Sequence, residues 1–317
     1  MKKLVLLLFV LFSICSTSQA QWLKNDTLPT RVWNFREEFP QQINKKRLRG
    51  IIGTEAAIYS VGLAYMSLIW YKDAKWQPLQ FFNDNTEWEQ VDKLGHAYTS
   101  YQLSERGYYA LRWAGATKRK ALLYGATMSL MALAPVEFLD GFTDEFGFSV
   151  PDMVANTAGT VLFIGQEALF NEQIIKMKWS YHFSEYAPLI PNQLGKSLSS
   201  RIFKDYNGHT YWFSVNLYSA LGKTAKIPKW LCLSVGYGAD GMMAKFANPY
   251  PLYQDKPFPY FDRYQQYYLS VDIDLNKIPT RSRLLKKLFQ QLNLLKIPAP
   301  TLEWNQIQGL KFRPLYF

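Results

Sequence analysis

The stretch PDMVANTAGTVLFIGQEALF, residues 151–170, stands where the periodicity of the chain changes. It begins with proline in a first-turn position and is otherwise largely apolar, which indicates a helix. Its few polar side chains are Asp152, Asn156, Gln166 and Glu167. Three earlier segments are also helical in pattern, namely 51–71, 92–115 and 118–138. We therefore expect a bundle of about four largely apolar helices over residues 51–175, two or three of them candidate membrane segments.

After residue 170 the apolar positions recur with a period of two. In residues 267–276 every second side chain is apolar, and residues 210–217 and 231–238 alternate in the same way. Such alternation is typical of strands with one buried face. The chain is therefore expected to have an α+β fold, with a small antiparallel β-sheet packed on the helices in residues 176–317.

An outer-membrane β-barrel is the alternative for the C-terminal half, given its aromatic strands and the terminal Phe317. Such a barrel needs at least about eight strands, and only about five can be counted. Under strict alternation Lys311 and Arg313 also share a face with Leu315 and Phe317, which interrupts an all-apolar row facing lipid. The small sheet is therefore favoured.

Residues 281–296 are predicted to form an amphipathic basic helix. Apolar side chains recur on one face, whereas lysine, arginine and amide side chains occupy the rest. The helix is either an ordinary surface helix docked on the sheet or an interfacial helix on anionic lipid. Membrane lipid is thus an expected partner, and an envelope protein is the other partner considered. No nucleic-acid partner is expected, because an exported chain rarely meets nucleic acid.

The first 20 residues have the order of a secretory signal peptide. Lys2 and Lys3 precede an apolar run, and Ser18-Gln19-Ala20 resembles a cleavage site. Lipidation at Cys15 is not expected, because Ile14 stands where lipoprotein signals carry a small residue. The mature chain is therefore expected in the cell envelope, on the periplasmic side of the inner or the outer membrane.

Residues 21–50 are predicted to be an irregular arm that ends in the basic run 45–49. The next segment, 51–71, is long enough to cross a bilayer as a helix. The positive-inside rule would then place the basic run in the cytoplasm, which conflicts with a cleaved signal. Either the signal is retained as an extra span, or the helices form a compact bundle without standard membrane insertion.

Composition narrows the class of protein. The 317 residues are 48% hydrophobic, which predicts packed domains rather than disorder. The net charge of +11 lies mainly after residue 170, where 19 Lys and Arg stand against 9 Asp and Glu. Two cysteines exclude a disulfide framework, a zinc finger and an iron–sulfur cluster. The common nucleotide-binding, nucleophile-elbow and zincin motifs do not occur.

A set of polar side chains lies near the ends of the predicted helices. Asp92 and His96 are four residues apart and share a helix face, and Glu137 and Asp140 close the third predicted helix. Antiparallel helices joined by short loops bring such ends together, so these side chains are expected to converge. The other members of this polar cluster are Lys93, Ser149, Asp152 and Asn156.

Two hypotheses follow from the polar cluster. In the first, the protein is a non-enzymatic envelope protein with a structural or scaffolding role, and the cluster holds the helices together. In the second, it is a membrane-associated hydrolase or transferase acting on an anionic lipid or a cell-wall precursor. His96 is then the general acid or base and Asp92 orients it. Glu137, a further catalytic candidate, would hold a divalent cation together with Asp140 and Asp152.

The same residues carry a family resemblance. Three motifs follow one another in the chain: DKxGH at 92–96, ExxDG at 137–141 and GFSxxDxxANxxG at 147–159. This succession is similar to the motifs of the YfiM-like predicted periplasmic lipoproteins, a family of unknown function. It is more distantly similar to the VanZ-like membrane proteins, which tend to have Glu-x-x-Gln where this chain has Glu137 and Asp140. The C-terminal half resembles longer members from Gram-negative bacteria. The resemblance covers roughly residues 51–170 and implies an envelope location and a bundle of about four helices, without supplying a reaction.

Overall fold

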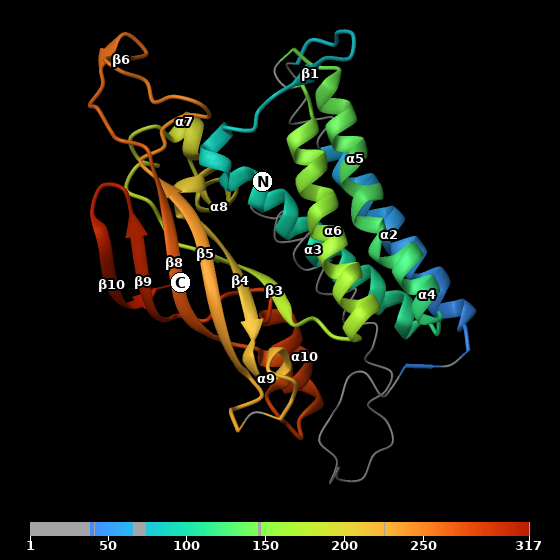
Figure 1. Ribbon diagram of the computed structural model, residues 1–317. Coiled ribbons are helices and arrows are strands. Elements are labelled where there is room, and N and C mark those ends of the chain that lie inside the picture. The colour runs from blue at the N-terminus through green and yellow to red at the C-terminus, as the bar shows by residue number, and fades with distance from the viewer. Residues whose placement is uncertain (1–38, 41, 66–73, 145–146, 225, 317) are drawn as a thin grey trace. The chain divides into compact units, whose positions relative to one another are not determined.

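The computed structural model describes residues 39–40, 42–65, 74–144, 147–224 and 226–316. The predicted signal peptide and most of the predicted arm lie outside these residues. The chain divides into two compact units (Figure 1). The helical unit comprises residues 1–83 and 99–168, and the sheet unit comprises residues 84–98 and 169–317. Each unit is described by itself.

The helical unit contains the expected bundle (Figure 1). Its helices are α2 (Lys45–Tyr65), most of α3 (Val91–Trp113), α4 (Lys118–Lys120) with α5 (Met128–Gly141), and α6 (Val150–Phe170). A π-helical turn, η5 (Ala121–Ala126), joins α4 to α5. The short strands β1 (Phe81–Phe82) and β2 (Phe148–Ser149) pair in parallel. Helix α2 begins at Lys45, so the basic run predicted to end the arm forms its first turns.

Two features hold α3 against its neighbours within the helical unit. Gly107 lies so close to η5 that a Cβ there would stand 2.1 Å from the carbonyl oxygen of Gly125. Buried hydroxyl groups form the second feature: the Thr160 hydroxyl lies 2.7 Å from the hydroxyls of both Ser100 and Ser129. Ser104 lies 2.9 Å from Ser129 and completes this hydroxyl network. The network links α3, α5 and α6 with neutral hydrogen bonds.

One stretch of the helical unit has the length and composition of a membrane-crossing helix. Lys118–Gly141 span 24 residues and contain an 18-residue window with a mean hydropathy of 1.5, and no other helix in the described ranges passes the same test. This result rests on length and composition alone. The predicted span 51–71 is described only to residue 65, where it forms part of α2.

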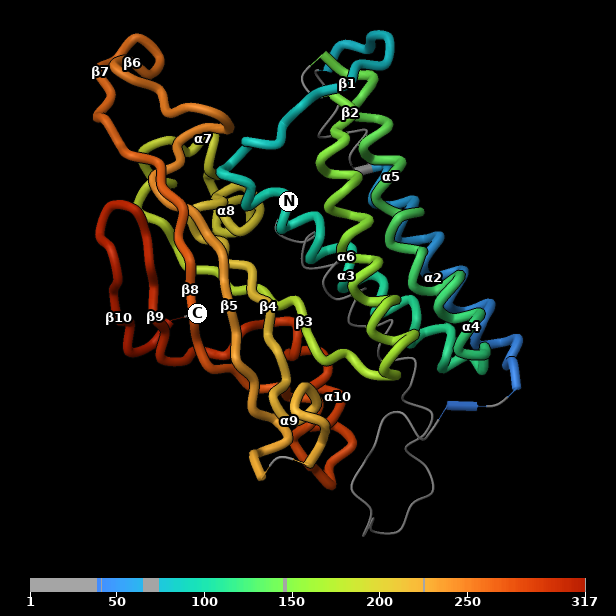
Figure 2. Tube along the Cα trace, viewed as in Figure 1, coloured from blue at the N-terminus to red at the C-terminus, as the bar shows by residue number. Residues whose placement is uncertain are grey.

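The sheet unit is built on one six-stranded antiparallel sheet, which confirms the α+β fold. Its strands are β3 (Ile175–Tyr181), β4 (His209–Asn216), β5 (Leu231–Asp240), β8 (Tyr264–Ile273), β9 (Ala299–Asn305) and β10 (Gly309–Tyr316). Figure 2 shows them side by side in the order β10-β9-β8-β5-β4-β3. The β3 edge is covered by residues 294–296: the Trp179 amide donates to the Leu294 carbonyl at 3.0 Å, and the Lys296 amide donates to the Trp179 carbonyl at 2.9 Å.

Short elements connect the strands. They are η4 (Glu87–Gln90), α7 (Pro191–Leu194), α8 (Leu198–Lys204), η6 (Tyr206–Gly208), α9 (Leu217–Ala220), β6 (Leu252–Tyr253), β7 (Lys256–Pro257), η7 (Leu275–Lys277) and α10 (Arg283–Leu292). The hydrophobic core of this unit lies at one end of the sheet, where Trp88 and Val91 pack with Tyr211, Met242 and Met243. This packing explains why η4 and the first turns of α3 belong to the sheet unit.

The two faces of the sheet have the opposite polarity to a water-soluble sheet. The inner face is polar and buried: Lys178 and Asp272 have no exposed side-chain surface and form an ion pair at 2.8 Å. The Ser214 hydroxyl donates to the same carboxylate at 2.6 Å. The outer face carries apolar side chains, of which Val235 is 51% exposed and Leu269 43% exposed. The strands are half-buried as expected, but the buried half is the polar one.

A register shift in β10 changes which side chains share a face. The pairing with β9 is irregular between Arg313 and Tyr316. Arg313 therefore points inward and pairs with Glu303, while Leu315 is 66% exposed. The expectation that Arg313 and Leu315 share a face was wrong, because strict alternation cannot anticipate a β-bulge.

Candidate functional site

The first turn of the DKxGH motif forms a polar cluster inside the sheet unit. The Tyr206 hydroxyl donates to Asp92 Oδ1 at 2.7 Å, and Lys93 Nζ lies 3.0 Å from Asp92 Oδ2. Lys93 also pairs with Asp84 at 2.8 Å. The Asp92 carboxylate thus has a donor on each oxygen.

Charges and hydrogen bonds keep Asp92 ionised. Burial alone would raise the pKa of Asp92, but the neighbouring His96 and Lys93 and the Tyr206 hydroxyl outweigh burial and hold the pKa below its ordinary value. Burial and the Asp92 charge raise the pKa of Tyr206 well above its ordinary value. The Tyr206 hydroxyl therefore remains protonated and acts as a donor.

His96 lies beside this cluster. Its Nε2 atom is 3.9 Å from Asp92 Oδ2, longer than a hydrogen bond, and its side chain is 26% exposed. The Asp92 oxygens are engaged by Tyr206 and Lys93 instead. This geometry favours a structural role for Asp92 over the orientation of a catalytic imidazole.

The other predicted site residues lie in the helical unit. Ser149 is buried, and its Oγ accepts a hydrogen bond from the Asp152 backbone amide at 3.0 Å, so Ser149 caps α6. Glu137, Asp152 and Asn156 are buried as well, at 4%, 5% and 0% exposure. Asp140 ends α5, where its carbonyl accepts from the Thr143 hydroxyl at 2.9 Å. The predicted polar cluster is thus divided between the two units, and its convergence stays a prediction.

Sequence reasoning missed the partners that Asp92 and the sheet interior use. Tyr206 lies 114 residues from Asp92 in the chain, and no motif joins them. The sequence does carry a signal for the charged sheet interior. Charges repeat with a spacing of two at Lys176 and Lys178 on one strand, and at Asp272 and Asp274 near the end of another. The strands that carry these charges are separated by β4 and β5, so the matched spacing indicates complementary charge without placing the two strands side by side.

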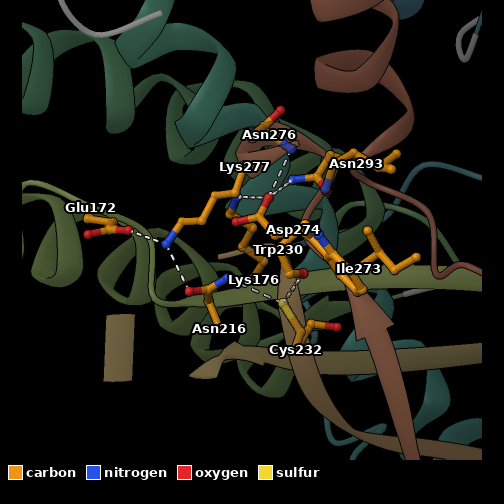
Figure 3. Close-up of polar contacts among 12 residues, drawn as sticks. Glu172, Lys176, Asn216, Trp230, Cys232, Ile273, Asp274, Asn276, Lys277 and Asn293 are labelled. Atoms are coloured by element: carbon orange, nitrogen blue, oxygen red, sulfur yellow. Dashed lines mark hydrogen bonds and ion pairs between the residues drawn. The ribbon is translucent and has the colours of Figure 1, made fainter. Parts of the chain in front are cut away.

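A second polar cluster lies just beyond the C-terminal end of β8 in the sheet unit (Figure 3). Lys277 Nζ contacts Glu172 Oε1 at 2.5 Å and Asn216 Oδ1 at 2.9 Å. Asp274 pairs with Lys176 at 2.7 Å and accepts from the Asn293 side-chain amide at 3.0 Å. These contacts tie α10 and η7 to the end of the sheet.

Lysines depress the pKa of Glu172. Partial burial would raise the pKa, but hydrogen bonds from Lys223, Lys277 and Ser219 lower it to about 2. All of these donors are protein groups, and the cluster is a network of paired charges. It therefore has the character of a structural site.

Comparison with known proteins connects part of the chain with a family of envelope proteins. Residues 80–165 match the model of the family described as predicted periplasmic lipoprotein (DUF2279). This match contains all three motifs and confirms the resemblance to predicted periplasmic lipoproteins and a periplasmic envelope location. The likeness to VanZ-like proteins stays a prediction. Neither a curated protein nor a solved structure matches the chain.

Proposed function

We propose that this protein is a non-enzymatic envelope protein that attaches to anionic membrane lipid through helix α10. The observation that carries this proposal is the exposure of the apolar face of α10. Leu284 is 79% exposed and Leu288 is 49% exposed, and no side chain of α10 is buried. A surface helix docked on the sheet would bury these leucines.

The charge of α10 specifies the kind of surface. Arg283 and Lys287 lie on the helix together with the exposed leucines, while Lys286 donates to the backbone carbonyl of Asn276. A cation close to an anionic membrane contributes on the order of 1 kcal/mol, and an amphipathic helix adds the burial of its apolar face. The excess of positive charge after residue 170 has the same sign. Anionic lipid is therefore the expected partner.

The alternative of a hydrolase or transferase depends on His96, Asp92 and Glu137, with a divalent cation at Asp140 and Asp152. The donors on both oxygens of Asp92 support a structural role for that residue. Burial of Glu137, Asp152 and Asn156 is compatible with either hypothesis. A structural and scaffolding role is therefore the function we favour.

Co-sedimentation with vesicles tests the proposal. The full chain is mixed with vesicles of phosphatidylglycerol and phosphatidylcholine, or of phosphatidylcholine alone, at low and high salt. We expect stronger binding to the anionic vesicles and weakening by salt. The double variant Leu284→Gln, Leu288→Gln keeps helix propensity but should bind at least about tenfold more weakly, because burial of a leucine contributes about 1.5–3 kcal/mol.

A matched control is Leu198→Gln in α8, which removes another exposed leucine (61% exposed) from the sheet unit. This variant should bind anionic vesicles like the unmodified chain. Equal binding of the α10 variant and the control would overturn the proposal, as would binding that is indifferent to anionic lipid.

A further inference from the structure

The outer face of the sheet is organised in rows that run across the strands. The first row is aromatic, because Tyr237 pairs with Tyr267 and Tyr267 pairs with Trp304 in register. The ring centroids of these neighbours lie 5.4 and 5.6 Å apart. The second row is Phe213, Val235, Leu269, Leu302 and Phe312, and the third is Val215, Leu233 and Val271. An aromatic row beside apolar rows is the order found at a membrane interface.

The apolar rows are exposed on β5, β8, β9 and β10 and partly covered on β4, whereas the polar face behind them is closed. Leu302 and Phe312 in the second row are 40% and 61% exposed. On the opposite face Gln266 donates to Glu303 at 3.1 Å, and Glu303 also pairs with Arg313. A water-soluble antiparallel sheet commonly packs its apolar face inward and solvates its polar face. This sheet satisfies its polar groups internally and leaves the apolar side chains for an apolar surrounding.

Two grooves cut into the outer face. The larger, about 440 Å³, is walled by Phe213, Val235, Tyr237 and Tyr267 and reaches Lys93. The smaller, about 240 Å³, runs between Leu269, Leu302 and Leu310. Asn85, Gln90 and Leu94 also line the larger groove, so η4 and the first turns of α3 border it on one side.

The dimensions of the patch formed by the three rows fit contact with one leaflet rather than a structure that crosses the bilayer. The three rows extend from Tyr267 to Val271 of β8, four steps or about 14 Å, and across five strands, or about 19 Å. A spanning barrel has an apolar band about 25 Å tall and no open edge. Here β10 pairs with β9 alone among the strands in the described ranges. The patch is therefore too short, and its sheet too open, to cross a bilayer.

We infer that the outer face of the sheet lies on a membrane and is buried in the acyl chains of one leaflet. The aromatic row and helix α10 stand at opposite ends of the apolar rows, where both meet the headgroup region. Helix α10 supplies the positive charge that anionic headgroups complement. This inference extends the proposed function, because it adds a hydrocarbon-embedded face to the interfacial helix.

Depth-dependent fluorescence quenching tests the inference. A bimane label is attached at Leu269→Cys in the full chain, with the native cysteines replaced by serine and the fold checked by circular dichroism. Vesicles contain phosphatidylglycerol and a phosphatidylcholine brominated on its acyl chains. We expect the label at 269 to be quenched several-fold more than the same label at Lys204→Cys, an exposed position in α8. A second outer-face label at Val235→Cys should behave like the first.

Equal quenching at positions 269 and 204 in vesicle-bound protein would overturn the inference. It would also be overturned if light scattering showed a second copy covering this face, as a dimer that Leu269→Gln dissociates. The α10 variant separates this inference from the proposed function. If α10 does not contribute to binding, the Leu284→Gln, Leu288→Gln chain binds anionic vesicles normally, while quenching at 269 still reports whether the sheet face is in lipid.

Discussion

A network of buried hydroxyl groups joins the helices of the helical unit, whereas buried ion pairs join the strands inside the sheet unit. Thr160 links Ser100 and Ser129 in the first, and Lys178 faces Asp272 in the second. Loss of one partner of a buried neutral hydrogen bond costs about 1–3 kcal/mol, whereas loss of one partner of a buried ion pair costs about 3–5 kcal/mol. The stability of the sheet unit is therefore expected to depend on its buried ion pairs. Its polar interior also accounts for the apolar side chains on the outside.

Breaking the Lys178–Asp272 pair should have the largest effect. Lys178→Ala leaves a buried carboxylate without its main partner, so the free energy of unfolding should fall by about 3–5 kcal/mol. Urea denaturation measures the change. The double variant Lys178→Met, Asp272→Leu removes both charges and should recover most of the loss. A small effect of Lys178→Ala alone would show that the sheet interior does not depend on this pair.

The hydroxyl network of the helical unit should tolerate change better. Thr160→Val removes the hydroxyl shared by Ser100 and Ser129 without changing the shape of the side chain much. The expected loss is about 1–3 kcal/mol, because buried partners lose a hydrogen bond. The same denaturation experiment measures it. A loss larger than that of Lys178→Ala would reverse the comparison of the two units.

The partners of Asp92 can be ranked by two substitutions. Tyr206→Phe removes the donor at 2.7 Å and should lower the free energy of unfolding by about 1 kcal/mol or more. His96→Ala removes a group 3.9 Å away and should cost less. Metal analysis of both purified variants should match the unmodified chain. Loss of a bound divalent cation or of a cellular phenotype in a folded His96→Ala protein would instead support the hydrolase hypothesis.

The last expected effect is the pH dependence contributed by Glu172, whose ion pair with the exposed Lys223 is screened by solvent. Its pKa is about 2 in the folded protein and 4.5 for an unperturbed glutamate. The stabilisation is therefore complete above about pH 4.5 and is lost as the pH falls towards 2. Glu172→Gln should be less stable than the unmodified chain at pH 7 and equally stable near pH 2. A difference that persists at low pH would exclude this origin.

Periodicity predicted the class of fold because it reports local structure. The alternation around Phe213, Val235 and Leu269 gave β4, β5 and β8, and the helical pattern gave the bundle of α2 to α6. Alternation does not say which face is buried, since both faces of a strand fit the same period. The polar interior was therefore not foreseen. The bulge before Tyr316 was missed for a related reason, since it breaks the period within β10.

The candidate site was predictable only in part. Asp92, Lys93 and His96 do share the first turns of one helix, as their spacing required. Tyr206 reaches Asp92, and Asp84 reaches Lys93, through tertiary packing of the sheet unit, which no local spacing encodes. Trp88 and Val91 carry these turns into the core of the sheet unit. The sequence pattern of a single helix does not show that its first turns pack in one unit and the rest in another, so the division of α3 was not predicted.

Membrane fractionation of cells that produce the full chain tests the central claim most directly. The account predicts that the protein sediments with the envelope membranes, and that high salt releases less of the unmodified chain than of the Leu284→Gln, Leu288→Gln variant. Complete recovery of the unmodified chain in the soluble fraction, without detergent, would contradict attachment to membrane lipid.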